Sequence, residues 1–142
     1  MLNIRFLSDV SYLHVFVAGL AYWVMGSIWY MAVFSKPWAA GVAKWGIKMG
    51  EKPDSGTMMR KMIVSLICNI GGAFFLAWFI RNEYAYNAIY GAKIGFTGGI
   101  IAVMAFTTGD NWLGKPMSTW LVDATYHVAG LTVCGVILGA WH

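Results

Sequence analysis

The sequence contains little charge. Only 11% of its 142 residues are Asp, Glu, Lys or Arg, whereas a soluble domain carries about 25%. A water-exposed surface of this size could hardly be built from so few charged side chains. Hydrophobic residues make up 59% of the chain. The composition excludes a disordered tail, a secreted scaffold and most soluble enzymes, and it predicts a small integral membrane protein.

Cysteines and catalytic motifs are scarce as well. Cys68 and Cys134 both fall inside apolar stretches, and neither their number nor their spacing is typical of disulfides or of a zinc site. The chain lacks a Gly-x-Ser-x-Gly turn, a phosphate-binding loop and a His-Glu-x-x-His pair. We therefore predict no enzymatic activity and no metal site, and the sequence does not identify a cofactor.

Four apolar stretches are long enough to cross a bilayer. A spanning helix needs about 20 mostly apolar residues, and such runs lie at residues 10–34, 62–80, 89–108 and 119–141. They leave little of the chain outside the membrane. We therefore predict an all-α membrane protein, a four-helix transmembrane bundle that forms a single domain over residues 1–142.

The basic residues are unevenly divided between the two ends of this bundle. Seven of the ten lie in residues 35–61 or 109–118, at one end, and three lie at the other. Lys and Arg favour the cytoplasmic side of a membrane. The asymmetry places both loops in the cytoplasm and both termini outside, and it indicates a lipid bilayer rather than nucleic acid as the partner of the positive charge.

The loop of residues 35–61 carries the pattern of an amphipathic helix. Apolar and basic side chains recur there as separate stripes at helical spacing. The tryptophans would lie among lipid headgroups and the lysines would meet anionic phosphates. We predict an interfacial helix over residues 37–50 with the lipid-facing side chains Trp38, Trp45, Lys44 and Lys48. It would anchor the bundle or, alternatively, dock a lipid or a protein partner.

Glycines recur every four residues along the faces of two predicted spans. Helices associate in lipid through close backbone approach and polar contacts rather than through the hydrophobic effect. We predict that helices cross with nearly touching backbones at Gly91, Gly95, Gly99, Gly135 and Gly139. Four short helices cannot use every small face internally, so a homo-oligomer or a neighbouring membrane subunit is expected.

Polar side chains inside spans are costly and should face the bundle interior or a wet cavity. At about 1.5 Å of rise per residue, several fall in one layer of the cytoplasmic half. These are Trp29, Tyr30, Asn69, Asp123, Tyr126 and His127. Asp123 and His127 are four residues apart, so they share a helix face on which a carboxylate can hold an imidazole.

Three interpretations of this layer are open. It could be a buried hydrogen-bond network that ties the helices together. It could conduct protons or cations, because histidine titrates near neutral pH. It could also bind a metal with Cys68 as a third ligand, although transition-metal sites usually recruit three or four ligands.

The ends of the first and last spans resemble those of a known family. The motifs are the segments 26–30, 111–112, 121–127 and 135–141. Through them the chain is similar, over nearly its whole length, to the bacterial membrane family named domain of unknown function seventeen sixty-one. The resemblance implies a four-helix unit in the bacterial cytoplasmic membrane and brings no established activity. A proline typically follows the Trp29-Tyr30 pair in that family, whereas Met31 follows it here.

Two functions are compatible with these features. We expect a membrane protein that acts by assembly, as a homo-oligomer or as an accessory subunit of a larger complex. The alternative is a small ion- or proton-coupled transporter or channel centred on Asp123 and His127. That alternative requires a hydrated cavity reaching the layer from the cytoplasmic end, and a dry, fully hydrogen-bonded layer would argue against it.

Overall fold

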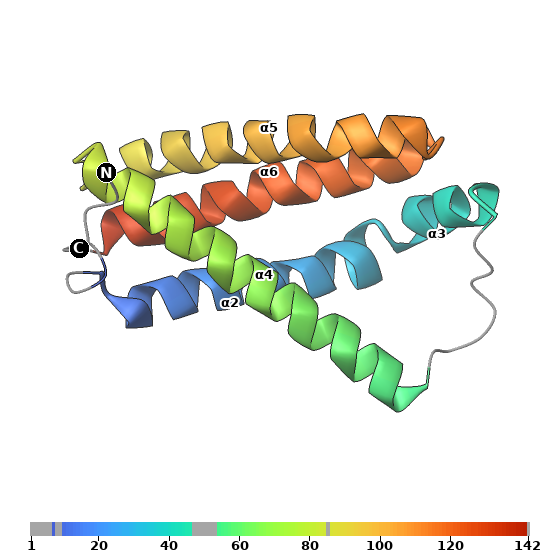
Figure 1. Ribbon diagram of the computed structural model, residues 1–142, viewed down its shortest axis with the longest axis horizontal. Coiled ribbons are helices and arrows are strands. Elements are labelled where there is room, and N and C mark those ends of the chain that lie inside the picture. Colours follow the sequence, from blue (N-terminus) through green and yellow to red (C-terminus); the bar gives the residue numbers. More distant parts are fainter. Residues whose placement is uncertain (1–6, 8–9, 47–53, 85, 142) are drawn as a thin grey trace.

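The computed structural model describes residues 7, 10–46, 54–84 and 86–141, and all regular structure in these ranges is helical (Figure 1). Four spans are long and apolar enough to cross a membrane. The elements are α2 (Tyr12–Ile28), η1 (Trp29–Val33), α3 (Ser35–Lys44), α4 (Ser55–Asn82), α5 (Ala88–Trp112) and α6 (Met117–Ala140). The predicted all-α membrane protein with four spanning helices is confirmed, the first span being α2 continued by the π-helix η1.

The four long helices do not pack equally. α5 and α6 run antiparallel in contact along their length, and α2 lies beside α6 (Figure 1). α4 crosses α2 obliquely, so that its second half joins the bundle while residues 55–68 diverge from α5 and α6. We call residues 55–68 the outer half of α4. All of them except Thr57 and Leu66 are exposed.

The contact between α5 and α6 contains all five predicted packing glycines. Gly91 of α5 faces Gly135 of α6 so closely that a Cβ on either would clash with the other's carbonyl group. A Cβ on Gly99 would lie 2.7 Å from Cα of Val128, and one on Gly139 would lie 2.5 Å from the carbonyl oxygen of Asn87. We call this contact the α5–α6 seam.

The first span changes geometry at the Trp29-Tyr30 pair. The backbone N–H of Phe34 donates to the carbonyl of Trp29 at 2.8 Å, a five-residue spacing that widens the helix into the π-helix η1. Such π turns often occur at functional sites. The helix is therefore distorted around Met31, the residue at which the sequence departs from the resembled pattern.

The helix predicted over residues 37–50 is shorter and begins earlier. α3 starts at Ser35 and ends at Lys44, because Gly46 adopts a φ of +80° that stops the helix. Residues 47–50, with Lys48, lie outside the described part of the chain. One face of α3 packs on the start of α6, where a Cβ on Gly41 would lie 2.8 Å from Oγ of Ser118.

The second span also begins earlier than its apolar run. Asp54 accepts a hydrogen bond from the backbone N–H of Thr57 at 3.0 Å and so caps the helix at Ser55 rather than at residue 62. The 28 residues of α4 extend over about 42 Å at 1.5 Å per residue. That length is enough to cross a hydrocarbon core of about 30 Å even when the helix is tilted.

Candidate functional site

The predicted polar layer lies in the half of the bundle that holds α3 and the α5–α6 connection (Figure 1). All six of its predicted side chains are hydrogen-bonded there, to one another or to neighbours on α2, α6 and the connection. They divide into two parts, a closed network among α2, α4 and α6 and an ion-paired group beside an open cavity.

The closed network is built around the buried Tyr126. The side-chain amide of Asn69 donates to the hydroxyl of Tyr126 at 3.1 Å, and that hydroxyl donates to the carbonyl of Tyr22 at 3.3 Å. The hydroxyl of Tyr22 shares a hydrogen bond of 2.5 Å with Nδ1 of His127. The ring of Tyr22 fits against Gly130, where a Cβ would overlap it. These contacts tie three helices together without an unpaired buried group among them.

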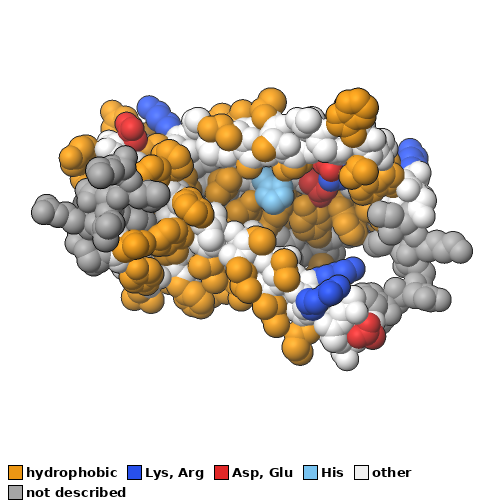
Figure 2. Space-filling view, viewed as in Figure 1, with side chains coloured by type: hydrophobic (Ala, Val, Ile, Leu, Met, Phe, Trp, Pro, Cys, Tyr) orange, Lys and Arg blue, Asp and Glu red, His pale blue; other side chains and the backbone are white. Residues whose placement is uncertain are grey.

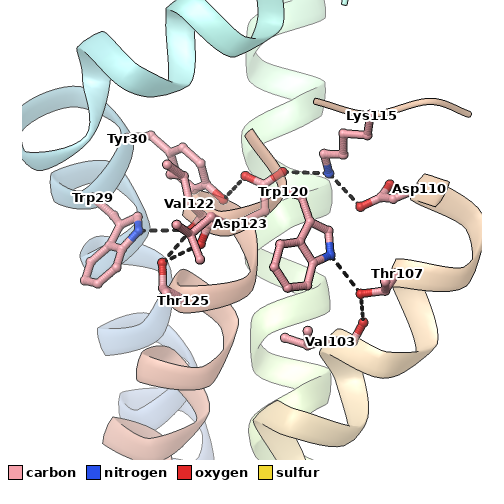
Figure 3. A network of polar contacts seen from close by, with 11 residues as sticks. Trp29, Tyr30, Val103, Thr107, Asp110, Lys115, Trp120, Val122, Asp123 and Thr125 are labelled. Atoms are coloured by element: carbon pink, nitrogen blue, oxygen red, sulfur yellow. Dashed lines mark hydrogen bonds and ion pairs between the residues drawn. The ribbon is translucent and has the colours of Figure 1, made fainter. Parts of the chain in front are cut away.

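The ion-paired group forms a chain from η1 to α5 (Figure 3). The hydroxyl of Tyr30 donates to Oδ1 of Asp123 at 2.7 Å, and Nζ of Lys115 contacts Oδ2 of Asp123 at 2.7 Å. Lys115 also contacts Oδ2 of Asp110 at 2.8 Å. Its side chain is 11% exposed and those of the two aspartates are 17% exposed.

Lys115 stays charged in this setting. Burial alone would lower the pKa of its ammonium group, but the hydrogen bonds to Asp110 and Asp123 outweigh that effect and raise the pKa. The group therefore contains two carboxylates and one firmly protonated amine, with a formal charge of about −1 when the nearby imidazole is neutral.

A cavity of about 380 Å³ adjoins this group. Figure 2 shows a histidine, an acidic and a basic side chain at the surface of the hollow between α4 and the α5–α6 pair. None of the described residues of α4 lines the cavity. We call it the polar cavity, and its wall consists of Tyr30, Trp38, Phe106, Asp110, Lys115, Asp123 and His127.

Asp123 and His127 do not form the pair that their spacing predicted. Asp123 binds Tyr30 and Lys115, while His127 binds Tyr22 from the opposite side, and no hydrogen bond joins the two. A full positive charge is the stronger partner for the carboxylate. The two side chains still share the polar cavity, and His127 connects that cavity to the closed network.

Three tryptophans near this end, Trp29, Trp38 and Trp45, turn towards the bundle. Nε1 of Trp29 donates to the carbonyl of Val122 on α6 at 3.2 Å. Trp38 and Trp45, which were expected to face lipid, are half-buried. The ring of Trp38 lies edge-on to Tyr30 at 5.5 Å, and Nε1 of Trp45 donates to the carbonyl of Leu113 at 3.1 Å. The nearby Lys44 is exposed.

Residues of the types that bind metal ions are dispersed in the described part of the chain. No three His, Cys, Asp or Glu side chains gather there closely enough to hold an ion. Cys68 is exposed on α4 and does not line the polar cavity. Cys134 is buried, and its Sγ donates to the carbonyl of Ala18 at 3.2 Å.

Four residues of the site were not predicted for it. Lys115 was used only to orient the chain, and Asp110, Phe106 and Tyr22 were not singled out. A signal for Lys115 and Asp110 was present in the sequence. The lysine directly follows Gly114 and the aspartate precedes it by four residues, and Gly114 takes the positive φ of +66° that a tight turn requires. Tyr22 had no such signal, since it is one of many aromatic residues in the spans.

The comparison with known proteins returns a family. The family described as "Protein of unknown function (DUF1761)" matches residues 13–139, which include every residue that lines the polar cavity. No curated protein and no solved structure matches the chain. The resemblance seen in the sequence is confirmed.

Proposed function

The chain belongs to the DUF1761 family, whose function is unknown, and we propose that it is a small polytopic membrane protein that acts by assembly. The assembly is a homo-oligomer or a larger membrane complex in which this chain is an accessory subunit. The proposed location is the bacterial cytoplasmic membrane with both termini outside, because the basic loops lie at the opposite end.

The incomplete wall of the polar cavity carries this proposal. Asp123 lies about 9 Å and His127 about 15 Å along α6 from its first residue, at 1.5 Å per residue. At such depth polar groups need water or protein beside them rather than lipid tails. The outer half of α4, which diverges from α5, leaves that side uncovered (Figure 2). A helix from a second chain between α4 and α5 would complete the wall.

The surface of α4 supports the same proposal. Met59 and Ile67 are each 63% exposed. A Cβ added to Gly71 would meet nothing within 4 Å. The open space beside Gly71 would allow close approach of another membrane helix, and the neighbouring exposed apolar side chains would be covered by it.

The two native cysteines provide a test. Cys68 is exposed on α4 and Cys134 is buried, so oxidative cross-linking in native membranes should join chains through Cys68 and not through Cys134. We expect a cross-linked product that Cys68→Ala abolishes and Cys134→Ala preserves. Light scattering should give an oligomeric mass in mild detergent and in lipid nanodiscs. A monomeric mass in both, with no cross-linked protein in membranes, would contradict the proposal.

Ion or proton coupling is a second candidate function. One observation favours it, namely that Asp123 and His127 line the same cavity near the end that holds the basic loops. Flux of protons and monovalent cations into proteoliposomes would test it. Asp123→Asn should abolish the flux, while Glu83→Gln, an exposed carboxylate at the opposite end, should leave it unchanged. Equal flux in Asp123→Asn and wild type would remove this candidate.

A further inference from the structure

We propose that the polar cavity binds a monovalent organic cation, a protonated or quaternary amine, in competition with the ammonium group of Lys115. The inference names a ligand class for the second candidate function, and it rests on that function's premise that a cation enters the polar cavity. Binding does not require transport, so the two can fail separately.

The charge of the cavity favours a cation. Asp110 and Asp123 supply two carboxylates, and Lys115 neutralises one of them. A net negative charge remains on side chains that are themselves only 11–17% exposed, and their attraction for a positive ligand is stronger than that of fully solvated groups. An anion would be repelled by this net charge, because the ammonium group of Lys115 is already paired with both carboxylates.

Aromatic side chains line the same space. Tyr30, Trp38 and Phe106 line the cavity together with the carboxylates. An aromatic ring attracts a cation through its negative face, and sets of such rings are the usual means of recognising quaternary ammonium groups. A divalent metal is less suitable, because the described residues offer no cluster of three ligands.

Lys115 already occupies part of this site as a tethered cation. Its Nζ lies 2.7 and 2.8 Å from the two carboxylates. The same atom lies 5.7 Å from the ring centroid of Phe106 and 5.9 Å from that of Trp45. The surroundings of this ammonium group thus show what the cavity holds well. A free amine that entered the cavity would have to displace this ammonium group from the two carboxylates.

The size of the cavity limits the ligand. About 380 Å³ falls in the lower part of the range of roughly 300–1,000 Å³ typical of small-molecule sites. A small alkylammonium ion fits such a space, whereas a large lipophilic cation would have to displace the wall.

Choline and its uncharged analogue dimethylbutanol, in which carbon replaces the nitrogen, provide the test. Calorimetric titration of the full chain in lipid nanodiscs should give binding of choline and weaker binding of dimethylbutanol, by about tenfold or more. Asp123→Asn and Asp110→Asn should each weaken choline binding, and Glu83→Gln should not. Equal binding of the charged and uncharged compounds, or no binding of choline, would overturn the proposal.

Competition with Lys115 has its own test. Lys115→Met removes the tethered cation, so choline affinity should rise by about tenfold, whereas Lys44→Met, an equal charge change at an exposed site of α3, should alter it little. A decrease in folded Lys115→Met, or binding of inorganic phosphate that depends on Lys115, would show that the lysine holds an anion instead. If Lys115→Met fails to fold, Asp110→Asn and Asp123→Asn still test whether choline binding depends on the two carboxylates. Choline binding without flux would support this inference and reject transport.

Discussion

The α5–α6 seam and the outer half of α4 are both apolar helical surfaces, yet one is closed and the other is open. In the seam, glycines at four-residue spacing bring two backbones into contact. In the outer half of α4, large side chains such as Met59 and Ile67 project from the helix, and almost every residue is exposed. Apolar character alone therefore does not pack membrane helices. Shape does, because lipid tails cover an apolar surface as well as another helix would.

This contrast has a consequence for the polar cavity. α5 and α6 carry most of its wall and are fixed to each other by the seam, so Asp110, Asp123 and His127 have a rigid support. The side that α4 would close is left to the less firmly packed helix. The polar cavity thus has a rigid wall on the α5–α6 side and an uncovered side towards α4, which a partner helix or a ligand can fill.

Enlarging a glycine of the seam should have the largest effect. Gly95→Leu would drive a side chain into the backbone of Leu131 and Thr132, and overpacking of this kind costs about 3 kcal/mol or more. We expect loss of the folded protein, or a much lower midpoint in thermal unfolding followed by circular dichroism in detergent. Gly71→Leu is the matched control, because the added side chain meets open space in the single chain. Equal losses in both variants would mean that the seam is not special.

Removal of the buried ammonium group of Lys115 should have the second-largest effect on stability. Lys115→Met leaves Asp110 and Asp123 facing each other without compensation, which should lower the free energy of unfolding by about 1–3 kcal/mol. Lys44→Met should stay within about 0.5 kcal/mol of wild type.

The pH dependence of this effect follows from the pKa of Lys115, which is raised in the folded state. The contribution of Lys115 to the free energy of unfolding is therefore complete below the ordinary lysine pKa and disappears as pH rises through the raised value. The stability difference between wild type and Lys115→Met should therefore be constant near neutral pH and narrow only at strongly alkaline pH, and a difference that vanished at neutral pH would contradict this account.

Substitutions in the closed network should lower the free energy of unfolding by a smaller amount. Tyr126→Phe removes the hydroxyl that accepts from Asn69 and leaves that buried amide without its partner, at a cost of about 1–2 kcal/mol. Asn69→Leu should be less harmful in the Tyr126→Phe background than in the wild type, because the unsatisfied donor is then absent. A double-mutant cycle from denaturant titrations measures this coupling. Strictly additive losses would show that the two side chains act independently.

The sequence allowed much of this architecture to be predicted, for a physical reason. A bilayer requires long apolar runs, so the four spans stand out, and the fixed rise of a helix then sets the depth of every polar residue. The side chains assigned to one layer, from Trp29 to His127, do come together in the structure. Depth, however, leaves the rotation of a helix undetermined.

The partners within the layer could not be predicted on that basis. Asp123 meets Lys115 because the turn at Gly114 returns the chain tightly, and the periodicity of the spans does not contain that turn. His127 meets Tyr22 because Gly130 lets the ring approach. The end of α3 was misplaced for a similar reason, since the positive φ of Gly46, rather than the apolar stripe, decides where that helix ends.

The smallest effect on the stability of the single chain should come from the outer half of α4. Met59→Ala and Ile67→Ala remove exposed side chains, so each should change the free energy of unfolding by no more than about 0.5 kcal/mol. If this surface receives a second chain, the same substitutions should shift the oligomer towards monomer, which sedimentation in detergent would detect. Ile101→Ala, an equally exposed position on α5 at 64%, is the matched control. A shift of equal size in all three variants would assign the effect to general lipid exposure, whereas a shift confined to α4 would identify its outer half as the surface that the seam leaves for a partner.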